Sequence, residues 1–291
     1  MMHNYQIITD SSCDLPQTLA DELQLQIVPL AVNYQSKEYH NYLDHRELDV
    51  EQFYAGLRAG EQTSTSAANP NAWREAAEPI LQKEEDVLIL AFSSGLSTTC
   101  NAACIAAQEL MEAYPDRKVL VVDTLCASMG QGLLCWHVAK AKEQGASLEE
   151  AQALAEEQKL HLCHWFTVDD LMFLNRGGRI SGATAVLGSL LQIKPVLHVD
   201  NEGHLISVSK ARGRKAAIQA LADKVGETAI DPASQTMFIS HGSCLEDAEY
   251  LASILKETYH VPEVIVNHVG PVIGSHSGPG TLALFFLGTQ R

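Results

Sequence analysis

The sequence of 291 residues lacks several features that define whole classes of protein. No apolar stretch approaches the roughly 18–20 residues needed to cross a bilayer. The amino terminus has no basic region followed by a long apolar segment, as a signal peptide has. Glycine-rich phosphate loops of the GxxxxGK[ST] and GxGxxG types are absent as well. We therefore expect a cytoplasmic protein without stable membrane insertion, and we expect neither nucleotide binding nor a cofactor.

Basic residues are scarce, with 20 Lys and Arg against 36 Asp and Glu, which gives a net charge of −16. Such a chain repels phosphate backbones, so nucleic acid is not expected as a partner. The seven cysteines are an odd number without CxxC spacing, which is typical of reduced thiols rather than a disulfide framework. Cys100 and Cys104, one helical turn apart, are interpreted as small core residues.

The first half of the chain alternates apolar strands with helical patterns. Tyr5–Thr9, Asp86–Phe92 and Lys118–Asp123 are the predicted strands, and the second is a short, continuous apolar run typical of a strand buried on both faces. This order predicts a parallel sheet flanked by helices. Polar clusters follow the strands at Asp10–Asp14, Ser93–Ser97 and Asp123–Ser128, at the strand ends where such sheets bind ligands.

The pattern changes after a helix that begins at a capping box of Ser147 and Glu150 and ends near Leu160. Ile193–Val199 and Leu205–Ser209 then flank a glycine-containing turn and predict a hairpin. Predicted helices at Arg214–Gly226 and Leu245–Tyr259 alternate with strands at Met237–Ser240 and Val264–His268. We therefore predict an α/β protein of two domains: residues 1–160 with a mainly parallel sheet, and residues 161–291, an α+β domain with a mixed or antiparallel sheet.

Two clusters of hydroxyl residues have two interpretations each. Thr63–Ser66 precedes a helical stretch from Trp73, and Ser93–Ser97 precedes another helix. The hydroxyls can cap the free backbone N–H groups of those helices. The same position gathers donors and the positive helix end around a carboxylate, which the two clusters could hold between them.

The segment Arg176–Ser181 contains two adjacent glycines that allow a tight turn, so that an arginine can be aimed at one point. In an acidic chain this is suited to anion binding, and a solvated loop arginine is the alternative. The following residues 182–191 are apolar or small on nearly all sides, which predicts a helix that is fully buried or lines an internal cavity.

Histidines offer two further hypotheses. His161 and His164 with Cys163 are a weak metal pattern, because no dense ligand cluster accompanies them. His276 lies in the glycine- and proline-spaced tail Gly270–Gly280, whose backbone we expect to turn sharply. A serine hydrolase would pair His276 with Ser97 or Ser94 and an acid such as Asp10 or Asp123, but the sequence has no Gly-x-Ser-x-Gly elbow.

Taken in order, these segments resemble the DegV family. The matching residues are Thr9-Asp10-Ser11 with Asp14-Leu15-Pro16; Thr65-Ser66 with Pro70; Ser93-Ser94-Gly95-Leu96-Ser97; Asp123-Thr124 with Ser128, Gly130 and Gly132; Leu174 with Gly177-Gly178-Arg179-Ile180-Ser181; Ile193-Lys194-Pro195; and the tail Gly270–Gly280. The resemblance covers nearly the whole chain, and the glycine-arginine motif together with the histidine tail is its most specific part.

The resemblance implies a non-catalytic protein that binds one long-chain fatty acid, with the acyl chain buried between or within the domains. Some family members present that acid to a separate, ATP-dependent catalytic subunit of a fatty acid kinase. By resemblance the carboxylate contacts fall on Thr65 and Ser97, and Arg179 and His276 complete the polar end. Ser66 and Ser128, which belong to matching segments, join the expected ligand-binding residues, and no metal site is expected.

Overall fold

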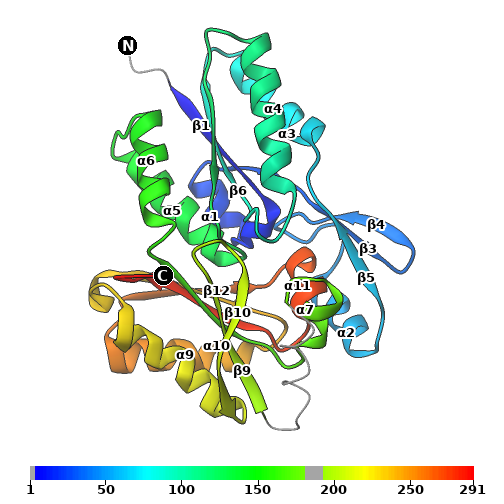
Figure 1. Ribbon diagram of the computed structural model, residues 1–291, viewed down its shortest axis with the longest axis vertical. Coiled ribbons are helices and arrows are strands. Elements are labelled where there is room, and N and C mark those ends of the chain that lie inside the picture. The colour runs from blue at the N-terminus through cyan, green and yellow to red at the C-terminus, as the bar shows by residue number, and fades with distance from the viewer. Residues whose placement is uncertain (1–3, 181–192) are drawn as a thin grey trace.

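The computed structural model describes residues 4–180 and 193–291, and Figure 1 shows two sheet-based layers, one above the other. The upper layer contains a parallel sheet with the strand order β2-β1-β6-β7. Its strands are β1 (Tyr5–Asp10), β2 (Gln26–Val28), β6 (Asp86–Ala91) and β7 (Val119–Asp123). The helices of this layer are α1 (Gln17–Glu22), α3 (Pro70–Leu81), α4 (Thr99–Ala113), α5 (Met129–Glu143) and α6 (Leu148–Gln158). The predicted parallel sheet with flanking helices is confirmed.

Strand β6 shows why this sheet has helices on both faces. All six of its residues are buried. Ile89 belongs to the core cluster that contains Trp73 of α3, whereas Leu90 belongs to the cluster that contains Leu133 of α5. Successive side chains of a strand point to opposite faces. The continuous apolar run is therefore explained by a strand that contributes to two cores.

The lower layer is a mixed sheet of six strands with the order β10-β9-β8-β13-β11-β12. Only β11 and β12 pair in parallel, across helix α10, and the other neighbours are antiparallel. The bounds are β8 (Leu162–Thr167), β9 (Ile193–Val199), β10 (Leu205–Arg212), α9 (Arg214–Thr228), β11 (Thr236–His241), α10 (Leu245–Tyr259), β12 (Glu263–His268) and β13 (Leu282–Leu287). The predicted hairpin is β9-β10, and the mixed second sheet is confirmed.

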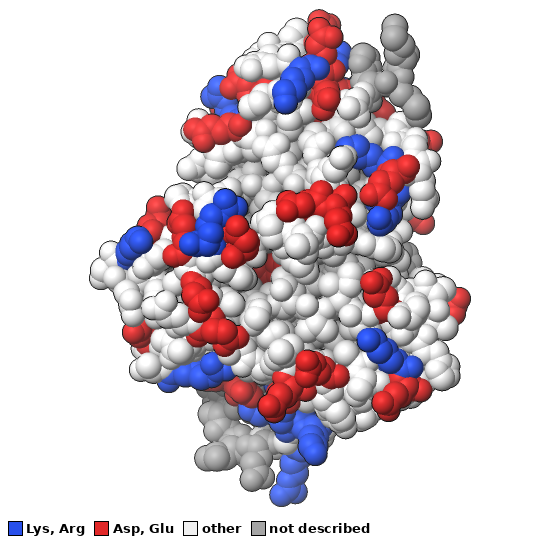
Figure 2. Space-filling model, turned by 180° about the vertical axis from the view of Figure 1, so that it is seen from behind, with Lys and Arg blue, Asp and Glu red and all other residues white. Residues whose placement is uncertain are grey.

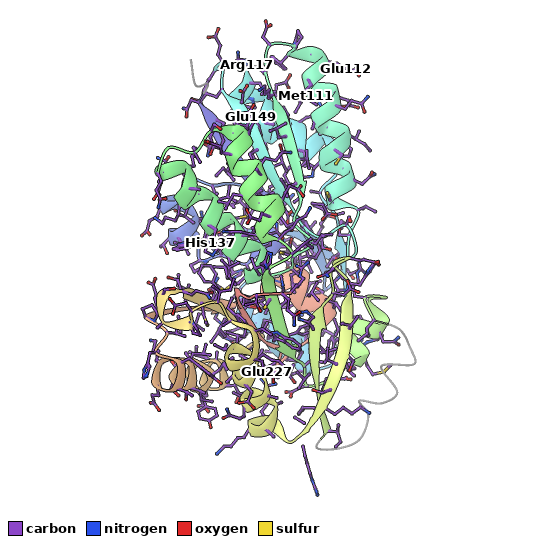
Figure 3. All side chains as sticks on the ribbon, turned by 60° about the vertical axis from the view of Figure 1, so that its left-hand side comes forward. Met111, Glu112, Arg117, His137, Glu149 and Glu227 are labelled. Carbon is purple, nitrogen blue, oxygen red and sulfur yellow. The ribbon has the colours of Figure 1, made fainter. Side chains whose placement is uncertain are left out.

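Helix α5 lies between the two layers and contacts strands of both sheets. Leu133 of α5 shares a core cluster with Leu90 of the upper sheet and Phe238 of the lower one. Figure 3 labels His137 of α5 near this junction, whereas Arg117 lies at the outer end of the upper layer. Burial lowers the pKa of His137 to about 4, so its ring is neutral near pH 7. Because Arg117 precedes β7 and lies at the outer end, the carboxyl ends of the parallel strands face the lower sheet.

A third, antiparallel sheet at one side of the molecule was not predicted. Its order is β4-β3-β5, and its strands are β3 (Ala31–Tyr34), β4 (Lys37–His40) and β5 (Thr63–Ser66). The interpretation of Thr63–Ser66 as a helix cap is wrong, because these residues pair with β3. Asn69 caps α3 instead, since its side chain accepts a hydrogen bond from the Ala72 N–H.

The tail also departs from expectation. Pro271–Ser277 forms helix α11, beside α2 (Val50–Arg58) and α7 (Met172–Arg176). Its ends follow the common asymmetry of a proline in the first turn and a glycine after the last. Gly278 has a φ of 78°, which ends the helix where a side chain would be strained. The glycines and prolines thus bound a short helix and do not produce a run of turns.

Other expectations have mixed outcomes. All seven cysteines are free, and Cys100 is buried, but Cys104 is exposed and is not a core residue. The capping box of Ser147 and Glu150 is present. The predicted helix within 182–191 lies outside the described residues. The division at residue 160 falls between α6 and β8 and stays a prediction.

The surface carries charges of both signs. Figure 2 shows acidic and basic side chains interspersed over the face turned away in Figure 1. Among the described residues, no helix combines the length and apolar character needed to span a bilayer.

Candidate functional site

A cavity of about 600 Å³ lies where the upper and lower layers meet. Its walls come from the loops after the parallel strands, from the lower sheet, from β5 and from α11. Most of the lining is apolar, including Leu30, Phe92, Leu96, Phe166, Leu174, Val199, Leu205, Val269, Val272, Ile273, Ala283 and Phe285. Clefts of this size and character commonly enclose a small organic ligand.

All six residues expected to bind a ligand line this one cavity: Thr65, Ser66, Ser97, Ser128, Arg179 and His276. They come from distant parts of the chain. Ser66 is exposed, Ser128 is buried, and the other four are half-buried. The cavity therefore brings these polar side chains together in a wall that is mostly apolar.

Thr65 and His276 form the first polar pair. The Thr65 Oγ1 atom lies 2.7 Å from the His276 Nε2 atom, which joins β5 to α11. Burial, and then the charge of Arg179, lower the pKa of His276 to about 4, so the ring is neutral near pH 7. When Nε2 carries the ring proton, it donates to Thr65, and the Thr65 hydroxyl proton is free for an anion.

Arg179 adds a positive charge beside this pair. Its Nε donates to the Leu96 carbonyl at 3.2 Å, and its Nη1 donates to the Gly177 carbonyl. Burial lowers the pKa of Arg179, and no carboxylate among the described residues opposes that effect. A guanidinium that remains charged without a counter-ion attracts an anion to this end of the cavity.

The absence of a side chain at Gly177 leaves room for the His276 ring. A Cβ atom built on Gly177 would lie 2.3 Å from the His276 Nδ1 atom. The neighbouring Gly178 has a φ of 73° but has no atom near the position of a Cβ. The two glycines therefore have different roles: Gly178 permits the turn, and Gly177 permits the close approach of His276.

The arrangement of a serine hydrolase is not formed. The Ser97 Oγ atom lies 2.9 Å from Thr99 Oγ1, and His276 bonds to Thr65. Both proposed acids are engaged elsewhere, because Asp10 accepts from the Phe92 N–H and Asp123 from the Ser94 N–H. Within residues 4–180 and 193–291, neither Ser94 nor Ser97 has His276 as a hydrogen-bond partner. The geometry gives no support to that alternative.

The metal hypothesis gains no support either. Among the described residues, no group of three or more His, Cys, Asp or Glu side chains is placed to hold a metal ion. His161 bonds to the Gly288 carbonyl and His164 to the Leu162 carbonyl.

Ser128 has a different environment from Thr65. Its Oγ donates to the Asp14 Oδ2 atom at 2.6 Å and lies 2.9 Å from Ser240 Oγ. Asp14 is only 3% exposed, and burial raises the pKa of its carboxyl to about 8 although the Ser128 hydroxyl opposes the shift. Ser128 therefore belongs to a second polar group in the same cavity wall.

Sequence reasoning missed several lining residues. Ser240 is a single serine near the end of a strand, and no motif marks it, whereas Ser277 lies in the Gly270–Gly280 tail but was not selected as a ligand-binding residue. His164 was considered only as a metal ligand, yet its ring is 1% exposed and lines the cavity. One signal in the sequence pointed to His164: it lies in an apolar strand pattern, which indicates a buried side chain.

The fold and the cavity define a class: an α/β protein with a mostly apolar pocket between its two layers and a positively charged arginine in the pocket wall. A model of the DegV family matches residues 4–289. The chain belongs to the DegV family. A DegV domain-containing protein of Clostridium perfringens is 44% identical over 290 residues, covering 100% of this chain and 99% of the relative.

Solved structures show the same fold. A DegV family protein of Thermus thermophilus, described by its fatty acid binding, is 32% identical with a TM-score of 0.86, covering 97% of this chain and 98% of that one. The Streptococcus pneumoniae fatty acid kinase B3 protein loaded with linoleic acid has a TM-score of 0.87 at 22% identity, covering 98% and 99%. At that identity the second likeness concerns the fold alone.

The raised pKa of Asp14 leads to a prediction about stability. A folded-state pKa of about 8 exceeds the ordinary aspartate pKa of 3.8, so the stabilising contribution is fully present below pH 3.8 and is lost as the pH rises through 8. We expect Asp14→Asn, which keeps a neutral polar group, to gain stability relative to the parent between pH 4 and pH 8. The expected gain is on the order of a few kcal/mol.

The measurement is chemical denaturation at several pH values. A difference between the two proteins that stays constant across this range would contradict the assignment of a protonated Asp14.

Proposed function

We propose that this protein binds one long-chain fatty acid without chemically changing it. The observation that carries the proposal is the guanidinium of Arg179, which has no carboxylate partner among the described residues, beside the Thr65–His276 pair at the edge of an apolar cavity. A fatty acid supplies the two complements, a carboxylate and a long apolar chain. The fatty acid binding described for the Thermus thermophilus relative supports the same ligand class.

In the proposed complex the carboxylate accepts hydrogen bonds from Thr65 and Ser97 and faces Arg179 and His276. Ser66 lies at the exposed side of this group. Charge-assisted hydrogen bonds fix the position of the head group more than they add affinity, because both partners lose water on binding. A nearby anion also favours the protonated form of His276, so binding should raise the pKa of that ring.

The acyl chain would provide most of the affinity. Each buried CH₂ group contributes about 0.8 kcal/mol, so a chain of ~16 carbons gains far more from the apolar wall than the head group gains from its hydrogen bonds. In this proposal the chain runs between and within the two predicted domains, 1–160 and 161–291.

We further propose that the bound acid is presented to an ATP-dependent kinase subunit. A carboxylate oxygen would attack the γ-phosphorus of ATP, the bond to the β-phosphate oxygen would break, and ADP and an acyl phosphate would result. This chain has no glycine-rich phosphate loop, so the partner would supply the nucleotide site. The resemblance of the sequence motifs to the family supports this role.

One test of the proposed function concerns the ligand itself. Solvent extraction and mass spectrometry of the purified protein should release long-chain fatty acid, and added palmitate or oleate should bind to the stripped protein. Thr65→Ala with Ser97→Ala should weaken binding by about tenfold or more, because two donors to a charged group are lost, while folding is largely kept. No bound acid together with no binding of added acid would overturn the proposal.

A matched pair of glycine variants tests the head-group site. Gly177→Ala places a methyl group against His276 and should weaken palmitate binding severalfold. Gly178→Ala strains the backbone at a φ of 73° but has open space for the methyl group, so it should lower stability more than it lowers affinity. Equal affinity losses in the two variants, measured by calorimetry, would show that His276 does not need its present position.

The kinase role has its own test. The palmitate-loaded protein, mixed with ATP and the catalytic subunit of a fatty acid kinase, should yield palmitoyl phosphate. Omission of this protein is the control and should abolish the product. Failure with several such kinases, despite tight palmitate binding, would reject presentation and leave lipid binding intact.

A further inference from the structure

A second polar group in the cavity wall is not used by the proposed head-group site. It consists of Ser128 at the start of α5, Ser240 of β11, and Asp14 behind them. Ser128 is 5% exposed and Ser240 is fully buried, yet both line the cavity. No hydrogen bond of the described residues joins this group to Thr65 or His276.

Apolar side chains of the lower sheet lie beside Ser240. Ser240 pairs with Ala283 of β13, and Ala283 pairs with Phe166 of β8, so the three side chains form one row across the lower sheet. All three line the cavity. Paired residues of neighbouring strands point to the same face. The two serines therefore place hydroxyl groups next to apolar side chains of the cavity wall.

Ser128 is hydrogen-bonded to Asp14 and Ser240, and among the described residues these two partners leave one of its acceptor sites unused. A hydroxyl has one donor and two acceptor sites. When Asp14 is ionised, Ser128 donates to it and accepts from Ser240, and one lone pair is left. When Asp14 is protonated on Oδ2, Ser128 accepts that proton and donates to Ser240, and again one lone pair is left. Burial favours the protonated carboxyl near neutral pH, since it raises the pKa of Asp14 to about 8.

The backbone of Ser128 supplies an independent observation. Its φ and ψ are 52° and −144°, and its side chain does not cap α5. A serine in this region has a strained backbone, and such strain concentrates at functional positions. The strained backbone holds the Ser128 hydroxyl at the cavity wall.

We propose that Ser128, oriented by Asp14 and Ser240, is a subsite for an oxygen substituent on the acyl chain, so that the ligand class includes hydroxy fatty acids. The inference rests on the proposed function. A ligand O–H donates to the free lone pair of Ser128, whereas a methylene at the same place leaves that lone pair buried and unpaired. Sites built around such a polar group discriminate against ligands that lack the matching one.

The test compares dissociation constants for stearate and for hydroxystearates with the hydroxyl at carbon 3, 10 or 12. The intact protein should bind at least one hydroxy acid about fivefold or more tightly than stearate, the value of one added hydrogen bond. Ser128→Gly removes the hydroxyl and suits the positive φ, and it should abolish that preference. Thr167→Val is the matched control, because Thr167 is a buried hydroxyl residue of β8 that does not line the cavity.

The outcomes separate the two proposals. Tight stearate binding without preference for any hydroxy acid would overturn the subsite, show that water satisfies Ser128, and leave the proposed function standing. A preference that survives in Ser128→Gly would also overturn the assignment. If neither stearate nor any hydroxy acid binds, fatty acid binding itself is wrong. The absence of a preference in the intact protein overturns the subsite even if the variant does not fold.

Discussion

The central physical constraint is a positive charge at the end of an apolar cavity. Arg179 is partly buried, donates to the carbonyls of Leu96 and Gly177, and has no carboxylate beside it among the described residues. In a chain with a net charge of −16, acidic side chains are plentiful, yet none of those described neutralises this guanidinium. In the function that we propose, an anion from outside the chain supplies the missing negative charge. The neutral His276 and the hydroxyl of Thr65 add donors without adding a competing negative charge.

The fold brings these groups together from four distant segments. Strand β5 carries Thr65, the loop before α4 carries Ser97, the turn after α7 carries Arg179, and α11 carries His276. The loops after the parallel strands and the side chains of the lower sheet line the cavity together. Helix α5 packs between the two sheets and contacts both of them. The packing of the two layers therefore forms both the apolar wall and the polar end of the cavity.

Much of this could be predicted from the sequence. The run at Asp86–Ala91 is apolar at every position because both faces of β6 are buried, which is why a parallel sheet was evident. Thr65 was selected through a family motif, but the local pattern suggested a helix cap. Its strand was missed because β5 is formed by pairing with the distant β3, and four hydroxyl residues carry no apolar alternation. Ser240 was missed because its role depends only on which elements meet in space.

The most direct test of the central claim compares palmitate with hexadecanol, which has the same chain length without the charge. Calorimetry would measure both ligands on the intact protein and on Arg179→Met. We expect the intact protein to prefer palmitate by about tenfold or more, since hydrogen bonds to charged groups are the stronger ones. We expect Arg179→Met to lose most of that preference while it still binds hexadecanol. An equal preference for palmitate in both proteins would show that Arg179 is not the group that recognises the carboxylate.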